Sequence, residues 1–95
     1  MKNYSSVHTI NIIDALRNGI ETEIEELESN GDITFRSVEK RTEFINDLLS
    51  EMIEEFENDM EYYGGYTPHF TDSVWDKIEW DKDYYDIEVI GDDEE

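Results

Sequence analysis

Cysteine is absent from the 95-residue sequence, so neither a disulfide framework nor a thiolate zinc site can support the fold. Basic residues are also scarce, since 7 Lys and Arg stand against 27 Asp and Glu, a formal net charge of −20. That charge argues against direct binding to nucleic acid or to an anionic membrane surface, because phosphates would be repelled. The sequence has no apolar run as long as a membrane span and no basic-then-apolar leader. We therefore expect a cytoplasmic protein that is neither secreted nor embedded in a membrane.

A chain this acidic raises the question of whether it folds at all. High net charge combined with low hydropathy is typical of disordered segments. However, 37% of the residues are hydrophobic and 13% are aromatic, and acidic disordered tails usually lack aromatics. The spacing of the apolar residues therefore decides between a folded domain and a disordered chain.

The first expected element is a helix over residues 9–30. Its apolar residues recur three or four positions apart, which is the period of one helix face: Ile10, Ile13, Leu16, Ile20, Ile24 and Leu27. Thr9 or Ser6 is expected to cap its start, and Gly31 after Asn30 to end it. Gly19 costs such a helix about 1 kcal/mol relative to alanine, which allows a kink or an early break. An alternative reading takes residues 7–13 as a short β-branched strand.

The clearest element is a helix over residues 38–63, ended by Gly64 and Gly65. Ile33 and Phe35 precede it as a short apolar pair, and Ser37 is its expected N-cap. At about 100° per residue, one face is predicted to form the core. That face consists of Val38, Ile45, Leu48, Leu49, Met52, Ile53, Phe56, Met60 and Tyr63.

The remaining sequence predicts smaller elements. Thr71 is the expected cap of a short helix over residues 72–81, with Asp72 favouring its first turn and Val74, Trp75 and Ile78 directed to the core. Apolar and acidic residues alternate from Tyr85 to Ile90, which indicates a short strand or an extended arm. The predicted fold is therefore mainly α, a single domain over residues 1–90. It consists of an antiparallel helical hairpin, a short third helix and the strand or arm, followed by a disordered acidic tail over residues 91–95.

The polar face of the 38–63 helix is acidic throughout. Seven carboxylates fall within roughly 120° of arc opposite the apolar face: Glu39, Glu43, Asp47, Glu51, Glu54, Glu57 and Glu61. No basic residue occurs between Thr42 and Asp76. Like charges four residues apart destabilise a helix by about 0.2–0.5 kcal/mol per pair. The sequence accepts this cost repeatedly.

Catalytic and metal chemistry find no support in these residues. The two histidines, His8 and His69, lie in no motif that would activate a nucleophile. Residues 81–86 begin like a calcium loop, but Tyr85 and Asp86 occupy positions where that loop needs a ligand and glycine. We therefore expect no enzyme, no metal site and no cofactor.

Eight of the twelve aromatic residues lie between Tyr62 and Tyr85. Large aromatic side chains prefer burial, so most of the eight are expected to pack within the domain. Trp80 and Tyr84 fall off the proposed core face and are the expected hydrophobic anchors for a protein partner.

The excess of acid favours a basic partner protein over mere solubility, because solubility requires a net charge of only about 2–8 and self-repulsion opposes folding. Carboxylates four residues apart on a helix repeat at about 6 Å, comparable with neighbouring phosphates on one strand. A rigid acidic helix could thus occupy the basic groove of a nucleic-acid-binding protein. The phosphate-mimicking surface is predicted to comprise the seven acids above, extended by Asp76, Glu79, Asp81, Asp83, Asp86 and Glu88.

In this acidic composition and its row of acids from Glu39 to Glu61, the sequence resembles the phage-encoded DNA-mimic inhibitors, a class of small acidic helical proteins. That resemblance implies inhibition of a bacterial defence nuclease, of the restriction or CRISPR type, inside the host cell. Two alternatives stay open: an antitoxin or masking partner of a basic protein, and an acidic adaptor or salt-adapted protein without nucleic-acid mimicry. The composition also allows a homodimer that covers leftover apolar surface.

Overall fold

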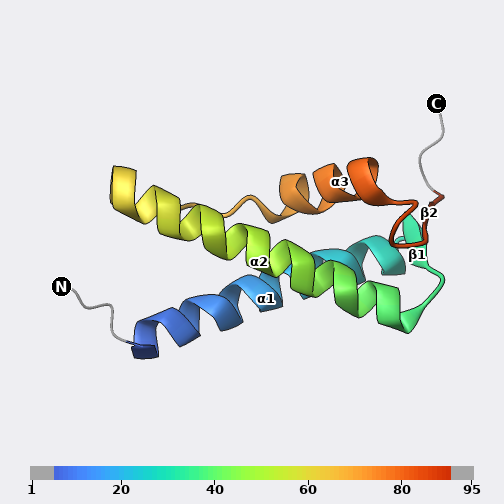
Figure 1. The fold of residues 1–95 in the computed structure, drawn as a ribbon. Coiled ribbons are helices and arrows are strands. Elements are labelled where there is room, and N and C mark those ends of the chain that lie inside the picture. The colour runs from blue at the N-terminus through green and yellow to red at the C-terminus, as the bar shows by residue number, and fades with distance from the viewer. Residues whose placement is uncertain (1–5, 91–95) are drawn as a thin grey trace.

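The computed structural model describes residues 6–90, with side chains from Ile12 onward. In chain order the elements are α1 (Ser6–Ser29), β1 (Ile33–Phe35), α2 (Val38–Tyr63), α3 (Phe70–Asp81) and β2 (Ile87–Val89). Figure 1 shows α1 and α2 crossing as an antiparallel hairpin, with α3 alongside α2. The predicted class is confirmed: a helical hairpin, a short third helix and a short C-terminal strand. The tail predicted over residues 91–95 lies outside the described residues.

Helix α1 is continuous, which corrects three expectations. It is already helical at Ser6, the first described residue, so Thr9 lies inside the helix and the predicted cap at Thr9 is wrong. The alternative strand over residues 7–13 is wrong for the same reason, and no break occurs at Gly19. The predicted end is confirmed, since Gly31 adopts φ +80°. The Asp32 N–H donates to the Leu27 carbonyl at 2.9 Å, as in a Schellman motif. The side chain of Ile10, predicted to join the core, is outside the described set.

Helix α2 has its predicted bounds because both of its caps form. The Ser37 hydroxyl accepts a hydrogen bond from the Lys40 N–H at 3.2 Å. Gly64 adopts the left-handed conformation, with φ +73°, that ends the helix.

The predicted core face of α2 needs correction at its two ends. Val38 is 80% exposed and Tyr63 is 82% exposed, because the ends of α2 extend beyond the helices that cover its middle. Conversely, Phe44 is fully buried although it lies off the predicted face. Its ring meets those of Phe35 and Tyr85 edge to face, with centroids at 5.6 and 5.2 Å. Helix α2 is therefore covered on a second side, by the sheet and by the segment after α3.

Helix α3 begins at Phe70, with His69 at the cap position and no side-chain cap, so the predicted cap at Thr71 is wrong. The chain leaves α3 through a second Schellman-type turn, in which the Ile87 N–H donates to the Lys82 carbonyl at 2.9 Å. Asp86 occupies the left-handed position of that turn, with φ +55°. The turn leads directly into β2, which pairs antiparallel with β1 in the register Ile33↔Val89 and Phe35↔Ile87.

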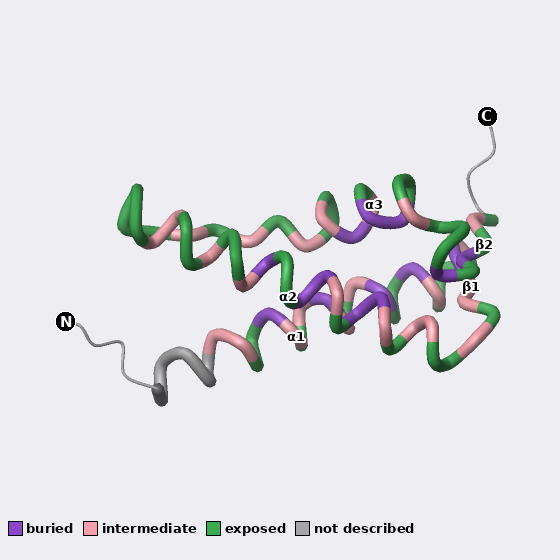
Figure 2. The backbone as a smooth tube through the Cα atoms, in the orientation of Figure 1, coloured by how far each residue is buried: buried purple, intermediate pink, exposed green. Residues whose placement is uncertain are grey.

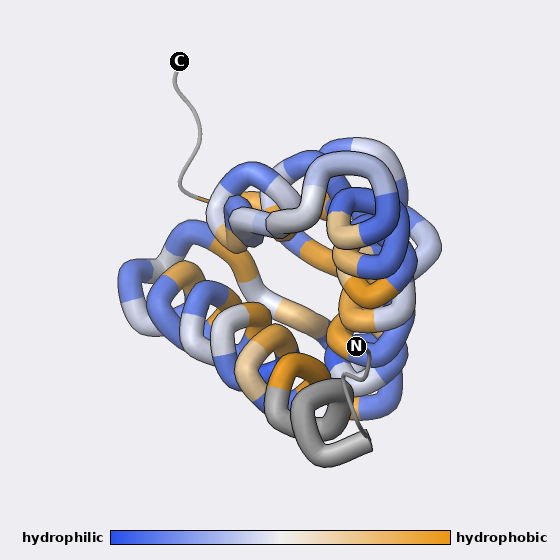
Figure 3. The backbone as a smooth tube through the Cα atoms, turned by 90° about the vertical axis from the view of Figure 1, so that its left-hand side faces the viewer, coloured by the Kyte–Doolittle hydropathy of each residue, from blue (hydrophilic) through white to orange (hydrophobic). Residues whose placement is uncertain are grey.

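The core lies where the hairpin, α3 and the sheet meet. Figure 2 shows burial concentrated there and decreasing toward the N-terminal end of α1 and the C-terminal end of α2. Viewed from that open end, the hydrophobic segments face inward (Figure 3). The Cα radius of gyration is 14.8 Å, against about 12 Å expected for this length, so the molecule is elongated. No helix within residues 6–90 is long and apolar enough to cross a membrane.

Candidate acidic interface

The acidic row on α2 does not face solvent along its whole length, contrary to the sequence prediction. Its N-terminal part contacts the segment that follows α3. Glu43 accepts a hydrogen bond from the Tyr84 hydroxyl, and Asp47 accepts one from the Tyr85 hydroxyl, both at 2.6 Å. Burial and the bond to Asp47 raise the pKa of Tyr85, while the bond to Glu43 raises the pKa of Tyr84. Both phenols thus remain protonated donors, and both carboxylates serve the fold.

Lys77 extends this attachment to the next turn of α2. Its side chain is only 6% exposed, and its ammonium donates to Glu51 at 2.7 Å and lies 3.9 Å from Asp81. The same ammonium lies 5.3 Å from the centroid of the Tyr85 ring, within cation–π range. A buried charge of this kind needs its partners. Glu51 and Asp81 are therefore partly committed to holding α3 against α2.

The C-terminal part of the α2 row is different. Glu54, Glu57 and Glu61 are exposed. No ion pair or side-chain hydrogen bond among the described side chains involves them. Glu39, at the start of the helix, is also exposed, with the Ser37 hydroxyl 3.5 Å away. These four acids remain available to a partner.

Helix α3 carries a second acidic row on its outer face. Val74, Lys77 and Ile78 form its buried face. The exposed acids Asp72, Asp76 and Glu79 recur four and three residues apart on the opposite side, and Asp83 continues the row into the following turn. None of the four forms an ion pair with a described side chain. Asp72 was missed as a surface residue because a first-turn aspartate already has a role at the helix dipole.

The two helices enclose an acidic groove with a cavity volume of about 320 Å³. Carboxylates from both helices line it: Glu51, Glu55, Asp76 and Asp81, together with Trp80. Glu55 was not predicted, because it lies at the edge of the apolar face in helical projection. Only the packing of α3 beside α2 brings it near Asp76.

Trp80 and Tyr84 are exposed, as expected for anchors, at 83% and 56%. Trp80 borders the acidic groove. The Tyr84 ring already lies 4.1 Å beneath the Lys40 ammonium, and its hydroxyl is bound to Glu43. Trp80 is therefore the freer of the two. Tyr62 and Tyr63 are also exposed. Most of the eight clustered aromatics pack within the domain, as expected: Tyr66, Phe70, Trp75, Tyr84 and Tyr85.

The last two predicted acids lie at the end of the molecule that carries the two-stranded sheet. Asp86 occupies the left-handed turn, and Glu88 lies 3.7 Å from the Arg36 guanidinium. Both are exposed, but each has a local structural role.

The carboxylates of the groove suit a cationic partner. Its lining residues show no pairing of a nucleophile with a base. His69 is exposed in the loop before α3, and the His8 side chain lies outside the described set. Within the described side chains, no group of three or more histidines and carboxylates could hold a metal ion.

Comparison of the chain with models of protein families, with curated proteins and with solved structures found no match. The functional argument therefore depends on the sequence and the geometry of this chain.

Proposed function

We propose that this protein binds a basic nucleic-acid-binding protein through the acidic faces of α2 and α3 and so competes with nucleic acid for that protein. The observation that carries the proposal is the α3 row. Its four exposed carboxylates, Asp72, Asp76, Glu79 and Asp83, follow one helix face without a cation partner among the described side chains.

Charge and spacing support this reading. Four residues of helix span about 6 Å, so the α3 row and the Glu54, Glu57 and Glu61 row present negative groups at a phosphate-like repeat. Only 7 Lys and Arg offset the 27 Asp and Glu of the sequence, which leaves the net charge of −20. The resulting self-repulsion opposes the compact state, and a cationic partner would relieve it. A groove built to bind a nucleic acid supplies regularly spaced Lys and Arg.

The target is proposed to be a bacterial defence nuclease of the restriction or CRISPR type, as the class resemblance implies. Inhibition would be stoichiometric, because the protein occupies the groove and transforms nothing. Association should be fast and should weaken steeply with salt, since the Debye length is about 10 Å at 0.1 M.

A matched pair of variants tests the proposal. The test variant carries Asp76→Asn, Glu79→Gln and Asp83→Asn on the outer face of α3. The control carries Asp14→Asn, Glu25→Gln and Glu26→Gln on α1. All six side chains are exposed, and each variant removes three negative charges. A difference between them therefore reports position and not net charge.

Each immobilised protein is incubated with bacterial lysate at low salt, and bound proteins are released with excess duplex DNA. We expect the wild type and the control to capture the same DNA-releasable proteins, and the test variant to capture at least tenfold less. The purified captured protein should lose DNA binding when one equivalent of the acidic protein is added. The proposal fails if nothing is released by DNA, if both variants capture equally, or if circular dichroism in buffered saline shows an unfolded wild-type chain.

The exposure of Trp80 favours a second candidate, a masking partner or antitoxin held by a hydrophobic anchor. An indole exposed to 83% beside a groove resembles the aromatic hot spots of protein interfaces. In that case Trp80→Ala should weaken capture more than the triple α3 variant does, and DNA should fail to release the partner.

A further inference from the structure

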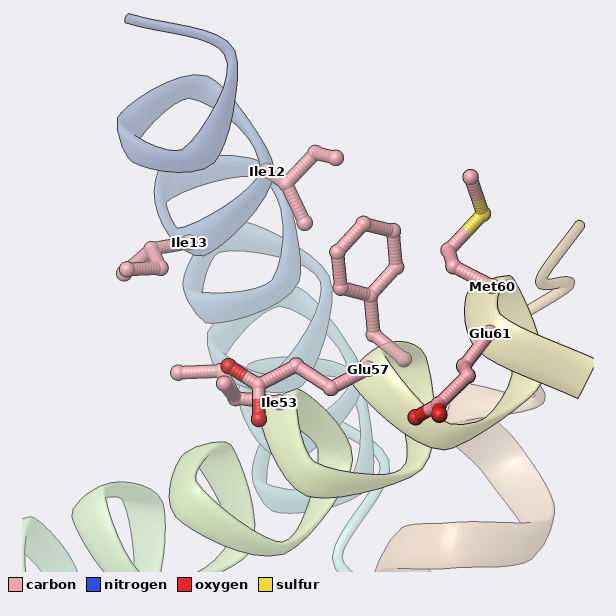
Figure 4. Close-up of a pocket in the computed structure, with 7 residues that line it drawn as sticks. Ile12, Ile13, Ile53, Glu57, Met60 and Glu61 are labelled. Carbon is pink, nitrogen blue, oxygen red and sulfur yellow. The ribbon is translucent and has the colours of Figure 1, made fainter. Parts of the chain in front are cut away.

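The open end of the helical hairpin contains an apolar cleft, and its rim includes Glu57 and Glu61 of the α2 acidic row. Its cavity volume is about 330 Å³. Figure 4 shows Ile12 of α1 directed toward α2 and Ile13 on the other side of the same helix, with Ile53 and Met60 on α2. These four side chains are only half-buried, in contrast to the closed core at the other end of the hairpin. The cleft therefore presents hydrophobic surface that the described residues leave uncovered.

A second hollow of about 240 Å³ adjoins the first. The two share Ile12 and Phe56. The second is completed by Ala15 and Leu16 of α1, by Tyr66 and Pro68 of the loop, and by Phe70 at the start of α3. The Phe56 and Tyr66 rings meet edge to face at 5.8 Å, which fixes the wall between the hollows. Two neighbouring apolar hollows suit two side chains that project from one face of a helix, three or four residues apart.

The rim of the cleft determines which helix fits. The polar residues that line the first hollow are Glu57 and Glu61, both exposed and carboxylate-bearing. Among the side chains from Ile12 to Ile90, no basic one lines either hollow. A second copy of this chain would bring the same two glutamates and another net charge of −20 to the contact. Like charges facing each other across an interface are unfavourable, so the charge complementarity favours a cationic occupant.

We propose that this cleft binds an amphipathic helical segment of a partner protein, whose apolar face enters the two hollows and whose flanking lysines or arginines pair with Glu57 and Glu61. This site lies between α1 and α2, apart from the α3 acidic row, and does not depend on nucleic-acid mimicry. It adds an apolar, shape-dependent contact to a molecule whose other candidate surface is electrostatic.

The probe is a fluorescein-labelled peptide of about 18 residues, long enough to form a marginal helix, with leucines at helical spacing and lysines elsewhere. A scrambled peptide of the same composition and a peptide with glutamine in place of leucine serve as comparison probes. Binding is followed by fluorescence anisotropy at physiological salt. We expect the amphipathic peptide to bind the wild type at least tenfold more tightly than either comparison peptide, because lysine charge alone does not fill the cleft.

Three variants localise the binding. Ile13→Ser with Met60→Ser removes apolar lining without changing charge and should weaken binding at least tenfold. Glu57→Gln with Glu61→Gln should weaken it several-fold and reduce its salt dependence. Tyr62→Ser with Tyr63→Ser is the matched control, since both tyrosines are highly exposed near the same helix end but do not line the hollows. That control should bind like the wild type.

Mapping on the unmodified protein removes dependence on any variant that fails to fold. In NMR titrations, the peptide should shift the amide signals of Ile12, Ile53 and Phe56 more than those of the α3 row. The proposal is overturned if the scrambled peptide binds equally, if the tyrosine control loses as much binding as the cleft variant, or if the shifts centre on α3. It is also overturned if sedimentation shows a dimer that Ile13→Ser with Met60→Ser dissociates, because a second copy would then fill the cleft.

Discussion

Gly19 offers the sharpest test of the packing, because the helix and the tertiary structure make opposite demands there. Alanine in place of an interior helical glycine normally stabilises a helix by about 1 kcal/mol. Here a Cβ at position 19 would overlap the Phe70 ring at the start of α3. Overpacking of this kind costs about 1–3 kcal/mol, so Gly19→Ala should reduce the free energy of unfolding by up to about 2 kcal/mol after the helical gain is subtracted.

A double-mutant cycle with Phe70→Ala isolates that clash. Without the phenyl ring, Gly19→Ala should stabilise the protein by about 0.5–1 kcal/mol, so the effect changes sign between the two backgrounds. Asn18→Ala, at an exposed neighbouring position of α1, is the control and should be mildly stabilising in both. Urea unfolding followed by circular dichroism measures the free energy of unfolding of the wild type, the two single variants and the double variant. If Gly19→Ala stabilises the protein in both backgrounds, the close packing of α3 on α1 is refuted.

Three further outcomes follow from particular contacts. Burial raises the pKa of Tyr66 from 10.0 to about 12 and raises that of Tyr85. The protonated phenols of these two tyrosines contribute their full stability to the folded state below pH 10. That contribution is lost as the pH rises through their folded-state pKa values. Stability measured by urea titration should therefore fall above pH 10. Tyr85→Phe should flatten that decline and cost about 1–2 kcal/mol at neutral pH through the lost bond to Asp47; an unchanged alkaline slope would contradict this. Asp86→Gly should stabilise the fold by about 0.5–1 kcal/mol, because glycine adopts the left-handed conformation without strain. Asp86→Asn is the control for the loss of charge. A loss of stability with glycine would contradict the turn geometry. The melting temperature should rise between about 20 and 200 mM NaCl and then level off, as screening is then nearly complete; a chain unfolded at low salt that stabilises only toward molar salt would instead indicate salt adaptation.

Most of the secondary structure could be predicted from the sequence because its signals are local. Ser37 and Gly64 bracket α2, and Gly31 ends α1, each through backbone hydrogen bonds made within a few residues. The period of apolar residues along α1 and the alternation around Ile87 likewise require no distant partner. The start of α3 was misplaced, because Thr71 has good capping chemistry but the packing of Phe70 against Gly19 extends the helix to Phe70.

The candidate site depended on contacts that no local pattern contains. In helical projection Glu43, Asp47 and Glu51 look identical to Glu54, Glu57 and Glu61. Only α3, through Lys77, and the chain that follows it, through Tyr84 and Tyr85, give the first three their partners, so that half of these six acids support the fold and half stay free. The packing of α3 beside α2 also places Glu55 near Asp76 and leaves Trp80 exposed.

By itself, then, the sequence determined the sign and size of the charge, the helical class, both ends of α2 and the C-terminal end of α1. These follow from composition and from interactions within one or two turns. The tertiary structure decided which carboxylates face solvent, why Gly19 is needed and where an apolar cleft stays open. Those features arise from residues far apart in the chain, and helix periodicity gives no information about which face a distant segment will cover.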